Sequence, residues 1–524
     1  MDTKALRQKI LDLAIRGKLV PQDPNDEPAS VLLERIRAEK QQMVKDGRLK
    51  AKDVKNDTVI FAGEDNLHYE KFADGTVKCI EEEIPFDVPD GWEWARLCNI
   101  AEADLGKMLD AVKNKGVPRP YLRNINVRWG AFDLTDLLEM RIQDEEVDRY
   151  SIQKGDLVVC EGGEPGRCAI WEAETGVFFQ KALHRVRPRL VLPEYLFLVI
   201  NAYTLSGLTE QYFTGTTIKH LTGQALRALL IPVPPIHEQK RLSKAAKDAL
   251  SFVDLIEKNR SDLIAVVSLA KERILDLAIR GQLVPQDPND EPASILLERI
   301  RTEKEELIKQ GIIKRDKRES VIFRGEDNSY YEKIDGDIRC IDSEIPFDIP
   351  ESWLFVRLKH IGEIIGGGTP KTNNPDFWDG SIAWITPADL SGYESMFIST
   401  GSRNITEAGL KGSSAQLMPV GSVLYSSRAP IGYVAIASNS ICTNQGFKSV
   451  VPSMVEMSQY LYFCLKARTD DIVQRATGTT FKEISGSQMA ETIIPLPPLN
   501  EQKAIANRIK ELLDMIGNIE GYLK

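Results

Sequence analysis

The sequence predicts an α+β protein: two mixed α/β globular domains joined by long antiparallel coiled-coil helices in a pseudo-twofold circular repeat. Three observations carry this prediction. A segment of 28 residues occurs twice, both chain ends fall at the same phase of that repeat, and an apolar heptad seam runs through the middle of the chain. At 524 residues the chain is also too long for a single core, which favours several domains.

The clearest repeat relates residues 13–40 to residues 277–304. The first copy reads LAIRGKLVPQDPNDEPASVLLERIRAEK, and 25 of its 28 letters return in the second copy. Four further pairs follow at offsets of 261 to 263: VIFAGEDNLHYEKF with VIFRGEDNSYYEKI, EIPFDVPDGW with EIPFDIPESW, TGTTIKHLTG with TGTTFKEISG, and IPVPPIHEQK with IPLPPLNEQK. Two copies of about 262 residues therefore account for the whole chain.

The segment between the copies is predicted to be one long helix with a coiled-coil seam. From residue 242 to residue 277, positions spaced alternately by four and three are apolar, except Arg260. The first half of this seam returns in 505–523 and the second half in 6–13. The tail followed by the head would rebuild a second central helix. We therefore expect antiparallel packing of the central helix against the terminal helices, which closes a ring. A single helical hairpin beside unrelated globular parts would not explain the shared phase of both ends.

Turn signals and composition divide the chain into seven segments. They are an N-terminal helical region at 1–50, a connecting β-like segment at 51–83, a first globular domain at 84–235, a central helical spacer at 236–310, a second connecting β-like segment at 311–344, a second globular domain at 345–498 and a C-terminal coiled-coil helix at 499–524. Both globular domains alternate short strands with helices. The two domains share short flanking motifs, in which Gln180 aligns with Gln445, while their loops differ in sequence.

Composition and missing motifs exclude several classes of function. No apolar run approaches the roughly 20 residues of a membrane span, so no membrane association is expected. The seven cysteines are scattered without a CxxC pair, which indicates reduced thiols in a cytoplasmic protein. Neither a phosphate loop nor metal-ligand spacing of histidines is visible. We therefore predict no catalytic residues and no metal site. A net charge of −10 means that any DNA binding must come from local patches.

The pattern of repetition itself suggests a function. Identical segments present two identical surfaces, which suit two copies of one partner; recent duplication is the simpler alternative. Divergent domains on the same frame suit two different ligands. An asymmetric, two-part DNA sequence fits such a protein, because half-sites on one face of a duplex recur at helical-turn spacing.

Several motifs carry a resemblance to a known family. Two divergent domains that end in TGTT-K and IP-PP--EQ, joined by duplicated long helices, resemble the specificity subunit of type I restriction-modification systems, the HsdS family. GGGTPKT, YSSRAPIG, TNQGF and TGTTFKEIS (within 366–485) resemble the second target-recognition domain of that family. YLRNINVRWGAFDL and GDLVVCEGGEPGRCAIW (within 121–171) resemble a common type of first domain. The resemblance covers essentially the whole chain.

The resemblance implies a non-catalytic recognition subunit that binds double-stranded DNA. Its expected partners are two methyltransferase (HsdM-like) subunits, which methylate adenine N6, and two restriction (HsdR-like) subunits, which cleave DNA in an ATP-dependent reaction. S-adenosylmethionine, ATP and Mg²⁺ are expected on these partners, and no cofactor on this chain. Two alternatives stay open: a protein scaffold that binds no DNA, and an enzyme with an unrecognised site.

Candidate DNA-binding residues are polar side chains in the loops of the two globular domains, because arginine pairs with guanine and asparagine or glutamine with adenine. In the first domain they are Arg123, Asn124, Arg128, Gln180, Lys181, Thr216, Thr217 and Lys219. In the second domain they are Lys371, Asn373, Arg428, Gln445, Thr479, Thr480 and Lys482. The threonines could donate to phosphates, but capping a helix explains them equally well. Trp129 and Trp378 are expected in the core rather than against a base.

Overall fold

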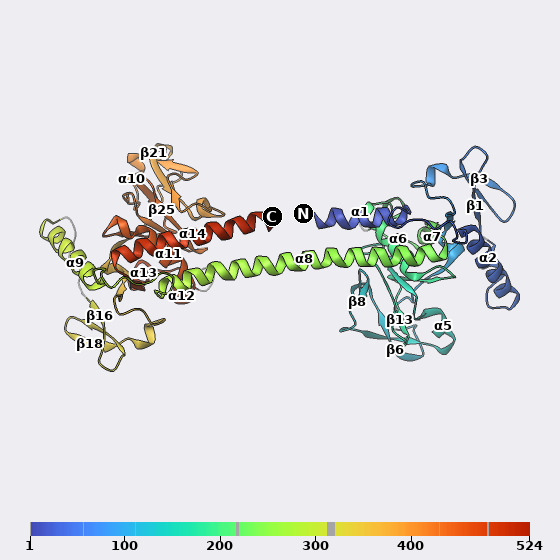
Figure 1. Ribbon diagram of the computed structural model, residues 1–524, viewed down its shortest axis with the longest axis horizontal. Coiled ribbons are helices and arrows are strands. Elements are labelled where there is room, and N and C mark those ends of the chain that lie inside the picture. Colours follow the sequence, from blue (N-terminus) through green and yellow to red (C-terminus); the bar gives the residue numbers. More distant parts are fainter. Residues whose placement is uncertain are drawn as a thin grey trace. The chain divides into compact units, whose positions relative to one another are not determined.

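The computed structural model describes residues 2–55, 57–110, 112–215, 219–311, 320–428, 430–478 and 482–523. The chain divides into two compact units, Met1–Asn259 (unit 1) and Arg260–Lys524 (unit 2), and the boundary lies inside helix α8 (Ile236–Ile279) (Figure 1). Each unit holds helices, a three-stranded sheet and a globular α/β domain. The prediction of a mixed helix and strand protein with two repeated domains is therefore confirmed.

Unit 1 begins with two helices of the repeated segment and a small antiparallel sheet. These elements are α1 (Thr3–Ile15), α2 (Ala29–Lys45), the short α3 (Ala51–Val54), β1 (Val59–Ala62), β2 (His68–Lys71) and β3 (Val77–Cys79). Gly17 follows α1 in the left-handed region at φ 64°, and Pro28 precedes α2, so the repeated Pro/Asp/Asn cluster forms the turn between two helices.

The globular domain of unit 1 contains two four-stranded sheets and helix α6. One sheet has the order β12-β11-β14-β5 (Cys168–Ile170, Leu157–Cys160, Leu183–Pro188 and Ala101–Leu105), and the other β10-β13-β6-β9 (Ser151–Ile152, Val177–Phe179, Val117–Leu122 and Leu138–Ile142). α6 (Pro193–Ser206) and the short α7 (Gly223–Ala228) complete the domain with β7 (Val127–Arg128) and β8 (Ala131–Phe132). Most apolar side chains of α6 are buried, which explains its high hydrophobicity.

Unit 2 repeats the order of helix, small sheet and globular domain, but the two sheets of its globular domain have five and three strands. Its helix α9 (Ala293–Lys309) and sheet β16 (Ser320–Arg324), β17 (Tyr330–Ile334) and β18 (Asp337–Cys340) match α2 and β1–β3. The domain holds a five-stranded sheet, β20-β27-β24-β25-β22 (Gly362–Gly366, Lys448–Pro452, Val423–Ser427, Ile431–Ala437 and Phe397–Ile398), and a three-stranded sheet, β23-β21-β26 (Arg403–Ile405, Trp378–Ile385 and Ile441–Thr443). Helices α11 (Ser458–Ala467), α12 (Thr469–Arg475), α13 (Gly486–Ala490) and α14 (Leu499–Leu523) follow.

The first and last strands of each globular domain pair with each other. In unit 1, β4 (Glu93–Arg96) is antiparallel to β15 (Leu230–Val233), and in unit 2, β19 (Leu354–Arg357) is antiparallel to β28 (Ile493–Leu496). The chain therefore enters and leaves each domain through one two-stranded ribbon.

In each unit a terminal helix lies antiparallel to the part of α8 in that unit. In unit 1, Arg7 of α1 pairs with Asp254 (2.5 Å) and Glu257 (2.7 Å), whereas Gln22, further along the chain, meets Glu238. In unit 2, Lys271 of α8 pairs with Glu520 of α14 at 2.7 Å. Several predicted seam residues are buried here: Leu242, Ala246 and Val253 in unit 1, and Val267, Ile505 and Ile509 in unit 2. Other positions of the predicted seam, Leu6, Ile256, Leu263 and Ile519, are exposed, so the seam is not buried along its whole length.

In each unit, a buried carboxylate at the start of the long helix hydrogen-bonds to the repeated turn. Glu238 accepts hydrogen bonds from Trp92 Nε1 (3.0 Å) and Gln22 Nε2 (3.1 Å). In unit 2, Glu501 accepts from Trp353 Nε1 (2.8 Å) and Gln286 Nε2 (3.1 Å). Burial raises the pKa of both carboxyl groups above the ordinary value. These contacts give a folding reason for part of the sequence identity in the repeat.

Candidate nucleic-acid interface

A hairpin at the end of the central strand forms the first part of the candidate site in each domain. In unit 1 it joins β11 to β12, and in unit 2 it joins β24 to β25. Gly166 and Gly432 occupy the same place in these hairpins, at φ 93° and 102°. A Cβ atom at Gly166 would lie 2.6 Å from Thr204 Oγ1, and one at Gly432 would lie 2.3 Å from Thr469 Cγ2. Only glycine fits, so both hairpins pack closely on the end of a domain helix.

One residue at the base of each hairpin joins three loops. The amide of Glu161 donates to Ala182 O (3.0 Å), and its carbonyl accepts from Leu221 N (2.7 Å). The amide of Ser427 donates to Gly446 O (2.7 Å), and its carbonyl accepts from Ile484 N (3.0 Å). The hairpin, the loop after β13 or β26, and the TGTT-K loop therefore meet in both units. We call the exposed side of these loops the reading face.

The third loop corrects an equivalence inferred from the sequence. Leu183 N donates to Gln180 O, and the corresponding bond in unit 2 runs from Phe447 N to Asn444 O. A Cβ at Gly106 would likewise lie 2.2 Å from Gln180 O, and one at Gly367 1.8 Å from Asn444 O. In the backbone, Gln180 therefore occupies the position equivalent to Asn444 and not the position equivalent to Gln445.

The side chains on this shared frame differ between the units. Gly162 follows Glu161 where unit 2 has Arg428 after Ser427, and His220 follows Lys219 where unit 2 has Glu483 after Lys482. Lys219 and Lys482 occupy matching places. An arginine can donate two hydrogen bonds to guanine O6 and N7, whereas Gly162 offers only backbone groups. The two reading faces therefore differ in recognition chemistry.

Several candidate residues of unit 1 take part in holding the loops. Arg123 Nη2 donates to Asp136 Oδ2 (2.6 Å), and Asn124 Nδ2 donates to Gly162 O (2.8 Å). Arg128 is half-exposed on β7 at 3.6 Å from Asp133. These contacts place Asn124 beside the hairpin and give Arg123 a bracing contact inside the domain. The other candidates of unit 1 that the structure describes are on or near the reading face: Gln180, Lys181 and Lys219.

Buried groups behind the loops also differ between the units. His184 is buried, and its Nε2 donates to Leu221 O (2.8 Å). Burial lowers the pKa of this imidazole, so it is neutral at neutral pH. The matching position in unit 2 is Lys448, whose Nζ lies 3.4 Å from a carboxylate oxygen of Glu483. Sequence reasoning missed Lys448, although it lies three residues after a candidate.

Two candidates of unit 2, Gln445 and Lys482, lie close to Arg428, because Ser427 donates to Gly446 O and Arg428 forms a bridge with Glu483. Thr369 hydrogen-bonds to Gln445, which brings the loop after β20 to the reading face. This loop continues to Lys371 and Asn373, both exposed. Arg428 is half-buried and Lys482 is exposed. Four candidates, Thr216, Thr217, Thr479 and Thr480, lie outside the described residues.

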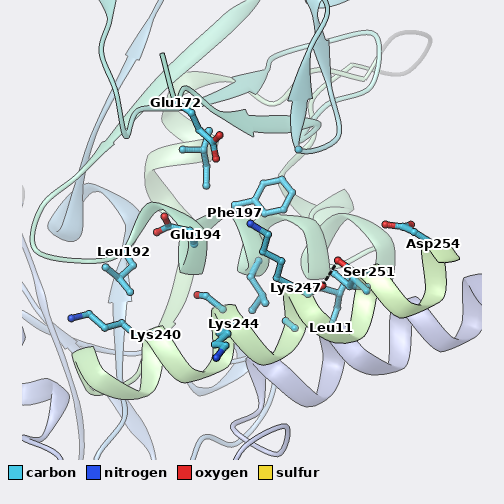
Figure 2. A pocket seen from close by; sticks show the side chains of 16 residues that line it. Leu11, Glu172, Leu192, Glu194, Phe197, Lys240, Lys244, Lys247, Ser251 and Asp254 are labelled. Atoms are coloured by element: carbon cyan, nitrogen blue, oxygen red, sulfur yellow. Dashed lines mark hydrogen bonds between the residues drawn. The ribbon is translucent and has the colours of Figure 1, made fainter. Parts of the chain in front are cut away.

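A groove lies between each globular domain and the start of its long helix. In unit 1 it measures about 660 Å³, and Lys240, Lys244 and Lys247 of α8 line one side, opposite Glu172 and Glu194 (Figure 2). The matching groove of unit 2 measures about 480 Å³, and Gln459, Lys503 and Asn507 line it instead. The groove therefore recurs in the same place in both units, but the charged side chains that line it differ.

The described part of the chain offers no cluster of three or more His, Cys, Asp or Glu side chains that could hold a metal ion. Its helices include none that is long and apolar enough to span a membrane.

Comparisons with known proteins agree on one family. The sequence model of the "Type I restriction modification DNA specificity domain" matches residues 89–264 and 350–523. The chain is 45% identical over 172 residues to the MjaIX specificity subunit of Methanocaldococcus jannaschii, covering 32% of this chain and 40% of that relative. It is 27% identical to the EcoAI specificity subunit of Escherichia coli, covering 99% of this chain and 90% of that relative. The HsdS subunit from Thermoanaerobacter tengcongensis shares the fold at a TM-score of 0.50 and 18% identity, over 84% of this chain and 94% of that one.

Proposed function

We propose, from the premise that the chain belongs to the type I restriction-modification DNA specificity family, that it recognises a bipartite, asymmetric DNA sequence. One observation carries the proposal. The two units hold three loops with the same backbone hydrogen bonds but present different side chains, such as Gly162 and Arg428. Each domain then contacts one half-site, and the two half-sites differ in sequence.

The chain acts in this proposal as the non-catalytic subunit of a cytoplasmic complex. It positions two methyltransferase subunits and two restriction subunits on the DNA. S-adenosylmethionine, ATP and Mg²⁺ are bound by those partners, which supply the methyl transfer and the ATP-dependent cleavage.

The repeated segment supports two copies of one partner. The buried contacts of Glu238 and Glu501 account for the repetition of Gln22 as Gln286. They do not account for exposed residues of the same turn, such as Asp23, Pro24 and Asn25, which are identical in the second copy. An identical exposed surface in both units favours the same partner at both.

We also propose that the long helices form antiparallel coiled-coil spacers of a pseudo-twofold ring and set the gap between the half-sites. Seven residues inserted into α8 preserve the apolar seam and lengthen the helix by roughly 10 Å. At about 3.4 Å per base pair, the preferred gap then grows by up to about three base pairs, with both half-sites unchanged. A changed half-site with a fixed gap would contradict the spacer.

The decisive experiment maps methylated adenines across the genome of a host that carries the system, with and without this gene. We expect one bipartite motif that disappears when the gene is removed. The purified chain alone, given S-adenosylmethionine and host DNA, should transfer no methyl groups. Turnover by the isolated chain would favour an enzyme, and an assembled complex without sequence-dependent DNA retention would favour a protein scaffold.

A further inference from the structure

One sheet in the globular domain of unit 1 carries an exposed leucine on its edge strand, β9. In the order β10-β13-β6-β9, Phe178 of β13 lies opposite Tyr121 of β6, and Tyr121 lies opposite Leu138 of β9. Phe178 stands two residues before Gln180, which sets the register of the reading loops. Leu138 is 44% exposed, so a large apolar side chain is open to solvent at this position.

The same register in unit 2 leads to an arginine. In the order β23-β21-β26, Cys442 of β26 lies opposite Trp384 of β21, and Trp384 lies opposite Arg403 of the edge strand β23. Cys442 stands two residues before Asn444, which matches the spacing in unit 1. Arg403 therefore occupies the position that Leu138 has in unit 1, and it is exposed as well.

Arg403 is held in place by an aromatic ring and by the backbone before it. Its guanidinium carbon lies 3.9 Å from the centroid of the Trp378 ring, and Trp378 is buried. The amide of Ser402 donates to Asp389 Oδ1 (2.8 Å), which fixes the start of β23. Among the described residues the guanidinium has no carboxylate partner. Its N–H groups can therefore donate to a ligand at little cost in side-chain entropy.

The loop after β20 connects Arg403 to the reading face of unit 2. Trp378, whose ring contacts Arg403, donates its Nε1–H to Lys371 O (3.2 Å). Two residues earlier in the same loop, Thr369 hydrogen-bonds to Gln445 of the reading face. Arg403 therefore lies beside a loop that already contains candidate DNA-binding residues.

Leu138 adjoins the reading face of unit 1 through a different set of hydrogen bonds. Arg123 Nη2 donates to the carbonyl of Asp136 (2.8 Å), two residues before Leu138. The residue after Arg123 is Asn124, whose side chain donates to Gly162 O of the hairpin (2.8 Å). The start of β9 is thereby tied to the residues beside the hairpin.

The exchange of Leu138 for Arg403 indicates a contact with bases rather than with phosphates. Every half-site presents the same phosphates, so a phosphate contact should be a cation in both units, as Lys219 and Lys482 are. A position that is apolar in one unit and cationic in the other matches groups that differ between half-sites. Base edges are such groups: guanine O6 and N7 accept from arginine, and the thymine methyl group packs against apolar side chains.

We propose that Leu138 and Arg403 are equivalent base-reading residues. Arg403 donates two hydrogen bonds to O6 and N7 of a guanine in the half-site of unit 2, and Leu138 packs on the methyl group of a thymine in the half-site of unit 1. Both residues lie within the ranges matched by the DNA specificity domain, 89–264 and 350–523. The inference rests on the proposed function and names the chemistry by which the two half-sites differ.

Modified guanines test Arg403 on the assembled complex. The half-site of unit 2 is the one that changes when residues 345–498 are exchanged. In a duplex that carries the methylated motif, each guanine of this half-site is replaced in turn by 7-deazaguanine, which lacks the N7 acceptor. One replacement should weaken binding by about tenfold. The same replacement should have no effect on the complex with Arg403→Leu, because that contact is already missing.

Further variants separate a base contact from a phosphate contact and from a folding defect. Arg403→Leu places the residue of unit 1 over the Trp378 ring, and its urea midpoint checks the fold; if that midpoint falls, Arg403→Lys takes its place in the comparison. Arg403→Lys should also lose the contact, because an ammonium group cannot reproduce two parallel hydrogen bonds. Arg324→Leu is the matched control: Arg324 is exposed and lies 5.8 Å from the Tyr330 ring centroid, but it falls outside the matched ranges.

Uracil tests Leu138 in the same way. Replacing each thymine in the half-site of unit 1 by uracil removes only a methyl group. One replacement should weaken binding by roughly fourfold, as expected for one buried methyl group, and the Leu138→Ala complex should be insensitive to it. Leu190→Ala is the matched control, because Leu190 is 49% exposed but follows the end of β14 that is remote from the reading loops.

The outcomes separate this inference from the proposed function. If the unaltered complex shows no preference for its methylated motif, the proposed function fails. If it binds that motif, but Arg403→Leu weakens binding equally on all sequences and Arg403→Lys restores it, Arg403 contacts phosphate and the inference is wrong. The inference is also overturned if the Arg403→Leu or Leu138→Ala complex responds to every base replacement that affects the unaltered complex. A half-site of unit 2 without guanine, or of unit 1 without thymine, on either strand would overturn it too.

Discussion

Glu161 of unit 1 and Ser427 of unit 2 make the same two backbone hydrogen bonds, yet the next residue is Gly162 in one unit and Arg428 in the other. The two reading faces are thus alike in everything that the backbone decides and unlike in what the side chains offer. The closely packed glycines and the junction hydrogen bonds fix the loops without involving these side chains. A domain of this kind can change its ligand without changing its fold.

The largest effect should follow from exchanging one whole domain. Replacing residues 345–498 with the matching domain of another family member should change one half-site completely and leave the other half-site and the gap as they were. Sequencing of methylated DNA measures all three properties together. A change in both half-sites would show that the two units do not act independently.

A buried ion cluster offers a test of whether the two units are equally stable. In unit 2, Glu332 accepts hydrogen bonds from two arginines, Arg357 and Arg339. In unit 1, Glu70 accepts from one arginine of the described residues, Arg96, and from Thr58. Glu332→Gln should lower the free energy of unfolding of unit 2 by about 1–3 kcal/mol, because it removes the buried carboxylate from the ion pair with Arg357 and leaves that guanidinium only the more exposed Glu344 and Glu491. Glu70→Gln should cost unit 1 less. Urea unfolding monitored in each unit measures both; equal losses would contradict the comparison.

The same cluster predicts a dependence on pH. Burial raises the pKa of Glu332, but hydrogen bonds from Arg357, Arg339 and Ser320 outweigh burial and lower it to about 2. The ordinary value is 4.5, so this carboxylate stabilises the folded state above pH 4.5, and the contribution is lost as the pH falls from there through about 2. The unaltered chain should therefore lose more stability over this window than the Glu332→Gln variant.

A smaller effect is expected from Arg428→Ala. Loss of a contact to a base edge should cost about 1–3 kcal/mol and relax one position of one half-site. Competition binding with DNA variants at that half-site measures it. Arg324→Ala serves as the control, because Arg324 is an exposed cation of the same unit and the first unit already has alanine there. Equal weakening on all sequences would make Arg428 a phosphate contact.

The smallest effects should come from the paired lysines. Lys219→Ala and Lys482→Ala should each weaken binding about equally on all sequences and reduce the salt slope by about one, as expected for phosphate contacts. Lys154→Ala is the control, since Lys154 lies at the opposite end of β11 from the hairpin. A change in the preferred sequence would instead assign the lysine to a base.

The repeat made the order of helices, sheets and domains predictable, because near-identical segments must adopt near-identical structures. The register of the reading loops was not predictable. Alignment of the two sequences pairs Gln180 with Gln445, whereas the backbone hydrogen bonds pair Gln180 with Asn444, one residue earlier. Non-local contacts also escaped the sequence: nothing in it places Arg123 against Asp136 or Asn124 against Gly162.

The two-stranded ribbons formed by β4 with β15 and β19 with β28 have a consequence for inheritance. Each domain is connected to its unit through two adjacent strands, so its two ends lie side by side in the folded protein. A gene segment that is bounded at these two strands therefore encodes a domain that can be exchanged as one piece. Homologous recombination within the flanking repeats can therefore replace such a segment in one event. Under the proposed function, such an exchange would change the DNA sequence recognised by one domain and leave the rest of the chain as it was.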